Sequence, residues 1–190
     1  MSPIEHRLFQ QSWPEGEYRF FQQGFLVDDV LAAAASWARV FGVGPFHVMP
    51  AFDQHAIYRG TEATITLQVA VAQAGPVQIE LIQQHCDRPS VFRDWSRGGT
   101  STFHQLATVT PDYDKKKAHY EGLGYEIVTE SLSGRFRVAF VDTVADFGFY
   151  TEVVESTPGF LANLGKIARA SEAWDGTDPV RLLGPDGRVK

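Results

Sequence analysis

An internal repeat constrains the fold of this chain more than any other feature of its sequence. The stretch RFFQQGFLVDD near the N-terminus and the stretch STFHQLATVTPD near the middle align without a gap when Gln22 is set on Gln105. Each has a small residue two positions after the glutamine and an aspartate seven positions after it. Such a repeat indicates two copies of one supersecondary unit.

The first copy predicts a strand, a helix and a further run of strands. Residues 18–27 are rich in aromatic and branched side chains, which are typical of a strand. Asp29 stands where a helix N-cap would stand and Gly42 where the helix would end, so we expect a helix between them. The strand candidates that follow are 45–52, 55–60, 63–75 and 76–84.

The second copy predicts the same order of elements. It follows a polar segment, 86–101, that holds Pro, Arg and paired Gly as a linker or an ordered loop would. Residues 102–109 are the expected strand, and a helix capped by Asp112 or Asp114 should end at the glycines of its last turn. The strands expected after this helix are 125–131, 134–143 and 147–155.

Each half begins with a glutamine on a strand and ends with a glutamate on another, because Glu80 and Glu152 also align between the halves. Strand side chains alternate between faces, so Gln22 is expected to share a face with Phe20, while Gln23 lies on the other face. A buried glutamine needs partners for two donors and one acceptor. Glutamines at matching positions therefore predict a shared polar centre.

Composition and charge argue against several classes of protein. With 190 residues, 44% of them hydrophobic, the chain can bury the core of one domain or of two duplicated half-domains. The net charge of −6 and the lack of a basic helix argue against a nucleic-acid partner. No apolar run approaches the roughly 20 residues that span a bilayer, and no signal peptide is recognisable, so we expect a cytoplasmic protein without a membrane partner. The single cysteine, Cys86, excludes an internal disulfide and a cysteine-based metal cluster.

In these features the chain resembles the vicinal oxygen chelate superfamily, which includes glyoxalase I, methylmalonyl-CoA epimerase, extradiol dioxygenases and bleomycin resistance proteins. The resemblance is carried by the segments QQGFLVDDVLAAAASWARVFGVGPF, VQIELIQ, FHQLATVTPDYDKKKAHYEGLGYEI and FGFYTEVVE. It is strongest to the epimerase and glyoxalase-like branch. It implies an α+β fold in which two βαβββ modules form a mixed sheet that curls around an open cavity. The implied domain is 19–156, with modules 19–84 and 102–156, between an N-terminal tail, 1–18, and a C-terminal helical extension, 157–190.

The resemblance also implies a metal site. The family carries its ligands on the first and last strands of each module, and the matching positions here are Gln22, Glu80, Gln105 and Glu152. Many members have histidine where this chain has its two glutamines. Since amide and carboxylate oxygens suit hard ions, the implied ion is of the magnesium or manganese type, or there is none. His104 is the rival ligand, because a bulge would turn it inward, whereas alternation sends it to the opposite face.

The implied chemistry is proton transfer next to a carbonyl group. A metal-bound carbonyl stabilises the enolate that forms when the adjacent proton leaves, and Glu152, with Glu80 across from it, is the expected base. We therefore expect a glyoxalase-like isomerase, epimerase or lyase that acts on a small apolar substrate. Extradiol ring cleavage is disfavoured because it needs an iron held by two histidines and a carboxylate.

The alternative is a non-catalytic module that binds a small molecule without metal, as bleomycin resistance proteins do. Without a cation, the two facing carboxylates would repel each other, and one would take up a proton and bond to its neighbour or to a glutamine amide. The resemblance further implies a homodimer.

Two further expectations concern the rest of the chain. The C-terminal segment carries apolar residues at helical spacing and should pack one face over the cavity or against a second chain. These residues are Phe160, Leu161, Leu164, Ile167 and Ala168. His47, His55 and His85 are expected at the surface, on loops or strand ends.

Overall fold

A computed structural model of the chain describes residues 19–94, 102–131 and 136–190. Its strands are β1 (Arg19–Leu26), β2 (Phe46–Val48), β3 (Phe52–Tyr58), β4 (Thr61–Ala74), β5 (Val77–Gln84), β6 (Thr102–Thr110), β7 (Ile127–Ser131), β8 (Val138–Val141), β9 (Tyr150–Glu155) and β10 (Val180–Leu182). Its helices are α1 (Val30–Phe41), α2 (Val91–Asp94), α3 (Tyr113–Gly122), α4 (Val144–Phe147) and α5 (Pro158–Glu172). The predicted tail, 1–18, and most of the second half of the predicted linker lie outside the described residues.

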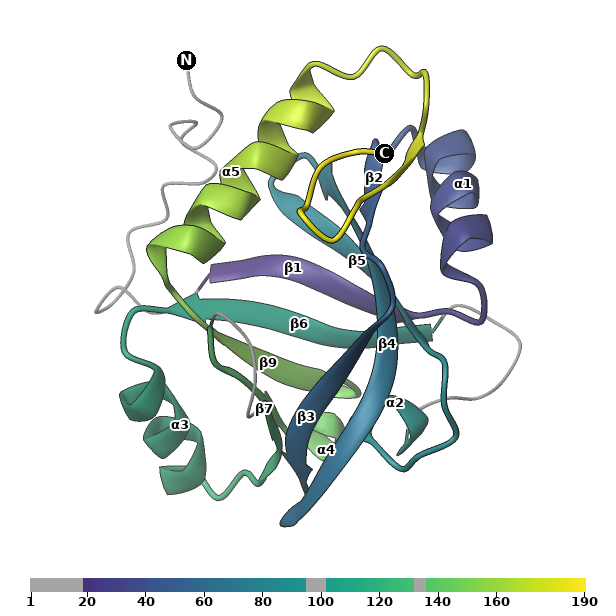
Figure 1. Cartoon of the computed structure of the whole chain (residues 1–190). Helices are drawn as coiled ribbons and strands as arrows, with labels where there is room; N and C mark the ends of the chain where they lie inside the picture. The colour runs from purple at the N-terminus through teal and green to yellow at the C-terminus, as the bar shows by residue number, and fades with distance from the viewer. Residues whose placement is uncertain (1–18, 95–101, 132–135) are drawn as a thin grey trace.

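The strands form a mixed sheet that closes into a barrel. The ring runs through β4, β3, β7, β8, β9, β6, β1 and β5, and β5 pairs back to β4. Figure 1 shows β1, β6 and β9 crossing behind the long β4, with α1 and α3 outside the ring. This arrangement confirms the predicted α+β fold of paired βαβββ modules.

The helix caps predicted from the sequence are present. Asp29 accepts hydrogen bonds from the backbone nitrogens of the first turn of α1, and Gly42 ends that helix with a φ of 64°. Asp112, one of the two candidates, caps α3 by accepting from the Lys115 backbone nitrogen. These caps satisfy backbone groups that a helix end leaves unpaired, so each helix begins directly after the strand that precedes it.

The pairing registers of the two halves match. In the first half, the parallel pair β1–β5 sets Gly24 beside Glu80. In the second half, the parallel pair β6–β9 sets Ala107 beside Glu152. The halves join through the antiparallel pair β1–β6, where Gly24 lies opposite Gln105. Residues that align in the sequence repeat therefore also have matching partners on the neighbouring strands.

Apolar side chains form separate layers inside and outside the barrel. Outside, α1 buries Val30 and Ala34 against β5, and α3 buries Tyr113 against β8 and β9. Inside, one cluster joins side chains from most of the strands, from α2 and from α5. Its buried members are Leu26, Ile65, Leu67, Val69, Val71, Ile82, Val91, Phe92, Val128, Phe140, Tyr150 and Ile167. These residues mark the inward faces of β1, β4, β5, β7, β8 and β9.

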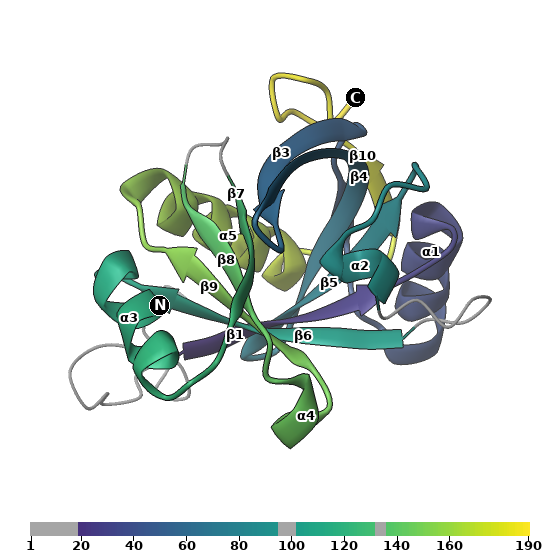
Figure 2. The same cartoon turned by 90° about the horizontal axis from the view of Figure 1, so that it is seen from below.

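Helices α5 and α2 lie at opposite ends of the barrel. Figure 2, which looks into the ring of strands, shows α2 in front and α5 behind. Ile167 of α5 belongs to the inner cluster, and Ser171 Oγ donates to the Gln73 carbonyl oxygen at 3.1 Å. Of the five apolar residues predicted to form one face, Leu161 is 46% exposed and points away. The C-terminal helix therefore covers one end of the barrel of its own chain.

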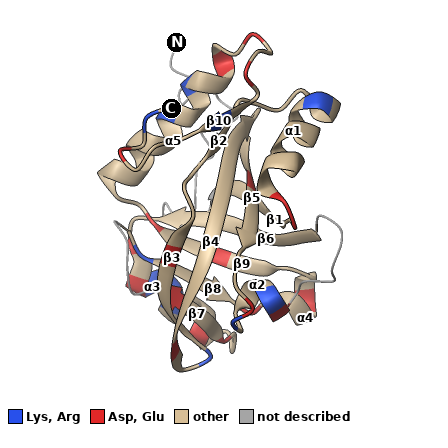
Figure 3. Ribbon diagram, turned by 45° about the vertical axis from the view of Figure 1, so that its right-hand side comes forward, with Lys and Arg blue, Asp and Glu red and all other residues tan. Residues whose placement is uncertain are grey.

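Ion pairs fix α2 at the other end. Arg59, in the turn between β3 and β4, contacts Asp94 of α2 at 3.0 Å, and the Tyr58 hydroxyl donates to Asp94 at 2.7 Å. Figure 3 shows acidic and basic positions interleaved in this region. These contacts hold a helix of one turn that has little stability of its own.

Several elements were not predicted. Helices α2 and α4 are single turns, and β10 is a short strand whose only strand partner among the described residues is β2. His47, expected at the surface, is 6% exposed on β2, and burial lowers its pKa. Among the described residues, no helix has the length and apolar character needed to cross a membrane.

Candidate functional site

The four residues predicted for the site lie on the inner face of the barrel, in two matching rows. One row is Glu80, Gly24 and Gln105 on β5, β1 and β6, and the other is Glu152, Ala107 and Gln22 on β9, β6 and β1. In each row a small residue separates a glutamate from a glutamine. A small residue leaves room for its two long neighbours to meet above it.

Gln105 joins the two carboxylates. Its Nε2 donates to Glu80 Oε2 at 3.1 Å and to Glu152 Oε2 at 3.2 Å. Gln105 is 1% exposed and Glu152 is 8% exposed, so the cluster is shielded from bulk water. The structure therefore brings three of the four predicted residues into direct contact.

Gln22 completes the inner face without a hydrogen bond to the other three. It is 8% exposed and pairs in register with Gln78 of β5. Gln78 is also buried, and its Nε2 has no hydrogen-bond partner among the described residues. A buried amide donor without a partner is costly, so this part of the barrel suits an oxygen-bearing ligand.

Gly24 provides the space that Gln105 occupies. A Cβ built at this position would lie 2.5 Å from Gln105 Nε2 and 2.8 Å from Gln105 Oε1. Any side chain at position 24 would have to displace the amide. Gly24, the small residue two positions after Gln22, is thus part of the site.

Two bulges set which residues face inward. On β1 the pairing with β6 shifts between Phe20 and Gln22, and on β6 it shifts between Gln105 and Phe103, so that His104 is the extra residue. A bulge breaks the alternation of faces. Accordingly Phe20, expected beside Gln22, is 55% exposed, which makes that expectation wrong.

The bulge on β6 puts both His104 and Gln105 inside the barrel. The His104 ring is fully buried and lies 5.0 Å from the Tyr150 ring and 5.9 Å from the Phe140 ring, measured between centroids. His104 and Gln105 were expected to be alternatives at the inward position, and the structure places both of them inside the barrel. Only Gln105 of the two contacts the carboxylates.

Burial changes the protonation of these groups. It raises the pKa of Glu80 well above the usual carboxyl range, with a further contribution from the charge of Glu152. Burial likewise raises the pKa of Glu152 to about 7. The Gln105 hydrogen bonds oppose both shifts. Without a cation, the pair therefore favours a state with at least one proton at neutral pH.

The donor set fits a hard cation better than a soft one. No group of three His, Cys, Asp or Glu side chains positioned for a metal is found in the part of the chain that the structure describes. A metal would need amide oxygens in addition to the carboxylates of Glu80 and Glu152. Two carboxylates that contact the same atom repel each other, and a divalent cation between them would relieve this repulsion. These residues therefore fit magnesium or manganese.

A cavity of about 200 Å³ opens at the α2 end of the barrel. Its apolar wall is Leu26, Ile82 and Phe92, and its polar rim includes Gln83 and Arg93. Ile82 is two residues after Glu80 on the same strand face, but Gln22, Glu80, Gln105 and Glu152 are not among the residues that line the cavity.

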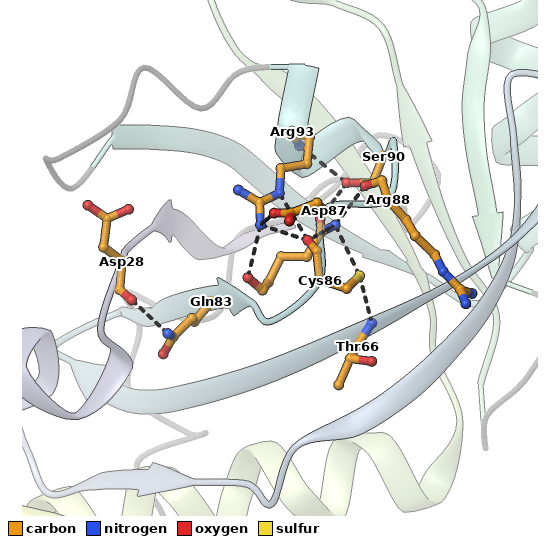
Figure 4. Close-up of polar contacts among 9 residues, drawn as sticks. Asp28, Thr66, Gln83, Cys86, Asp87, Arg88, Ser90 and Arg93 are labelled. Atoms are coloured by element: carbon orange, nitrogen blue, oxygen red, sulfur yellow. Dashed lines mark hydrogen bonds and ion pairs between the residues drawn. The ribbon is translucent and has the colours of Figure 1, made fainter.

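The rim of this cavity is built from ordered polar contacts. Figure 4 shows Arg93 against the loop that follows β5, where its Nη2 donates to the Cys86 carbonyl oxygen at 2.7 Å. On the other side, Gln83 Nε2 donates to the Asp28 carbonyl oxygen at 2.6 Å. Neither Arg93 nor Gln83 was singled out from the sequence, because only the fold brings the end of β5 to α2.

These features define the class of protein: two paired βαβββ units that form a barrel around carboxylate and amide side chains, as in the vicinal oxygen chelate fold. The family model described as the glyoxalase/bleomycin resistance protein/dioxygenase superfamily matches residues 21–140. The chain belongs to this superfamily. No curated protein matches the sequence significantly.

Solved structures support the same fold. The chain is similar to methylmalonyl-CoA epimerase from Mycobacterium tuberculosis, with 18% identity and a TM-score of 0.54 over 83% of this chain and 99% of that one. A variant of the Streptomyces coelicolor epimerase, in complex with 2-nitronate-propionyl-CoA, matches with 18% identity and a TM-score of 0.51 over 74% and 99%. A hypothetical protein from Bacillus halodurans C-125 matches with 13% identity and a TM-score of 0.53 over 73% and 94%. At these identities, the likeness concerns the fold alone.

Proposed function

We propose that this protein is a metal-assisted isomerase, epimerase or lyase that moves a proton next to a carbonyl group of a small, mostly apolar substrate. The observation that carries this proposal is the pair of buried carboxylates, Glu80 and Glu152, held together by one amide inside the barrel. Burial of two like charges is costly, and such pairs are common at sites where protons move. The domain that performs this function is 19–156.

The residues that would hold the ion are Gln22, Glu80, Gln105 and Glu152. Members of the superfamily often bind divalent metals. When bound, a hard divalent ion supplies positive charge that polarises a carbonyl oxygen. The chain's own contribution is to hold the donors in two fixed rows and to exclude water from them.

Glu152 is the proposed base. Its raised pKa brings proton uptake close to neutral pH, where a carboxylate can both accept and return a proton. Glu80, whose carboxylate contacts the same Gln105 nitrogen atom, is the proposed second group for proton transfer.

The cavity at the α2 end of the barrel is the proposed entry for the substrate. Leu26, Ile82 and Phe92 offer apolar surface, and Asp28 and Arg93 supply charges of both signs in its lining. A molecule with an apolar body and a carboxylate or carbonyl end fits this distribution. The coenzyme A complex of the Streptomyces coelicolor epimerase makes thioesters a sensible part of the substrate panel.

A second candidate function is small-molecule binding without metal. The closed hydrogen-bond cluster of Gln105 with both carboxylates favours it, because a shared proton would satisfy the pair. In this case the protein would retain a ligand in the cavity but would not turn it over. The metal content of the purified protein is the first discriminator.

Proton exchange in deuterated water, followed by NMR, tests the proposed function. The panel consists of small apolar keto acids, hydroxy acids and their thioesters, with Mg²⁺ or Mn²⁺ supplied. Glu152→Gln should lower the exchange rate by roughly 10²-fold or more, while ligand affinity changes little. Glu62→Gln, which removes the same charge from an exposed position on β4, is the matched control and should keep the wild-type rate. Equal exchange in wild type and Glu152→Gln would remove Glu152 from the mechanism.

A further inference from the structure

Gln78 lies on the inner face of β5, two residues before Glu80. The buried apolar side chains of β5 alternate between two layers, with Ile79 and Leu81 in the outer cluster and Ile82 in the inner one. The same alternation directs Gln78 and Glu80 inward. The pairing of β5 with β1 and with β4 shows no shift of register, so no bulge disturbs this order.

The Gln78 amide is buried with an unused donor. The residue is 3% exposed, and its Nε2 has no hydrogen-bond partner in the part of the chain that the structure describes. A buried donor in this state lowers the stability of the protein. Gln73, its neighbour on β4, differs, because Gln73 Nε2 donates to the carbonyl oxygen of Gly75 at 2.8 Å. The unpaired donor is therefore particular to position 78.

Gln78 extends the inner row that contains Glu152. Strand pairing sets Gln78 beside Gln22, which lies opposite Ala107. Ala107 in turn lies beside Glu152, and its small side chain leaves space in the middle of the row. Neighbouring strands are about 4.8 Å apart, and the curl of the barrel brings inward side chains closer together than their backbones. A small molecule can therefore contact Gln78 and Glu152 at the same time.

We infer that Gln78 is a substrate-binding residue whose Nε2 donates a hydrogen bond to an uncharged oxygen of the substrate, such as that of a ketone or an ester. The amide carries no charge, and no side chain of this row is cationic. A carboxylate buried against Gln78 would have no positively charged side chain as a partner, which is costly, whereas a carbonyl oxygen needs only the hydrogen bond. The inference rests on the proposed function in taking a substrate to enter the barrel, and it narrows that substrate to a neutral carbonyl compound.

Ligand affinity of the metal-free protein, measured by calorimetry with chelator present, tests the inference. The probes are methyl 4-methyl-2-oxopentanoate and the corresponding free acid, which share an apolar body and differ by one negative charge. Gln78→Met keeps the length of the side chain but removes the donor, so the affinity for the ester should fall about 10-fold. Gln73→Met removes an amide whose donor is already paired, and this matched control should bind the ester as wild type does.

Two results of this comparison would overturn the inference. One is an equal affinity for the ester in Gln78→Met and in wild type. The other is tighter binding of the free acid than of the ester by the wild type, because a preference for the anion contradicts an uncharged subsite.

A second measurement needs no variant. The ¹⁵N and ¹H resonances of the Gln78 side-chain amide in the wild type should shift when the ester is added, because a new acceptor meets Nε2. The amide resonances of Gln73 should stay in place. Gln78 resonances that do not move at millimolar concentrations of the ester would contradict the inference.

Stability separates a ligand-binding donor from a structural one. Without a partner in the ligand-free protein, the Gln78 donor stabilises nothing, so Gln78→Met should be at least as stable as wild type in urea denaturation. A lower free energy of unfolding in this variant would show that the donor is already paired, and would overturn the inference.

Proton exchange separates failure of this inference from failure of the proposed function. Exchange in the wild type, with an ester affinity that Gln78→Met leaves unchanged, would keep the proposed function and overturn the inference. Ester binding that depends on Gln78 but leads to no exchange would support the inference and remove the ester as a substrate.

Discussion

Gln105 reaches the two carboxylates of the barrel through the space left by the missing side chain of Gly24. The two residues lie opposite each other in the antiparallel pair β1–β6, and a Cβ on Gly24 would come to 2.5 Å from Gln105 Nε2. The atoms that this Cβ would meet all belong to the end of the flexible Gln105 side chain. The contact therefore constrains the site far more than it constrains the fold.

Gly24→Ala should accordingly separate function from stability. The methyl group displaces the Gln105 amide, and manganese affinity should fall by roughly 10-fold or more, as it does when a ligand loses its support. The free energy of unfolding should change by less than about 1 kcal/mol, because alanine is favoured over glycine within a strand. Calorimetry and urea denaturation measure the two effects.

The control for this substitution is Gly122→Ala, at the end of α3, where an added Cβ meets nothing within 4 Å. It should leave metal affinity unchanged. Metal affinity in Gly24→Ala equal to that of the wild type would show that Gln105 is not part of the centre.

The metal-free protein should lose stability as the pH rises from about 4.5 to about 8. Glu152 has a folded-state pKa raised from 4.5 to about 7, and burial also raises the pKa of Glu80 well above its usual value. The folded state thus binds protons more tightly than the unfolded chain, so its stability is complete below pH 4.5 and falls as the protons leave. The loss attributable to Glu152 is on the order of 3 kcal/mol. Urea denaturation across this range, with chelator present, measures it.

Glu152→Gln should flatten this pH dependence. The variant has no charge to bury at position 152, and Glu80 then has no like charge beside it. At pH 8 the metal-free variant should be at least as stable as the wild type. A variant that keeps the full slope would show that the raised pKa of Glu152 does not control it.

Addition of a hard divalent cation should stabilise the wild type at pH 8. A ligand that binds only the folded state contributes about 2.7 kcal/mol at a free concentration 100 times its dissociation constant. Thermal unfolding with Mg²⁺ or Mn²⁺ should show this shift, and Glu80→Gln should reduce it. A larger shift with Zn²⁺ than with Mn²⁺ would contradict the assignment of an oxygen-coordinated ion.

Helix α5 should contribute to stability through its inward face alone. Ile167 is 5% exposed in the inner cluster, so Ile167→Ala should cost about 2–5 kcal/mol. Leu161→Ala, on the same helix but 46% exposed, should cost far less. Equal losses in the two variants would mean that α5 does not close the barrel as described. Urea denaturation of the full chain compares them.

Much of this protein was determined by local sequence. The repeat aligned Gln22 with Gln105 and Glu80 with Glu152, and the caps at Asp29 and Asp112 fixed where the helices begin. These features depend on backbone hydrogen bonding and on the period of the side chains, which a short segment specifies by itself. The order of elements along each half followed from them, and the superfamily was indicated by the resemblance of the segments quoted above.

The tertiary structure alone decided which side chains meet. The bulges at Phe21 and His104 turned Phe20 outward and His104 inward against the alternation of a regular strand, because a bulge is a property of two paired strands and not of one. The contact of His104 with α2 depends on a single helical turn that Arg59 contacts through Asp94. The sequence marks Gly24 only as a small residue at a repeated position, and the pairing of β1 with β6 shows why the residue must be small. A polar centre could be predicted from the sequence, but its geometry came from strand pairing, since each strand carries only part of the site.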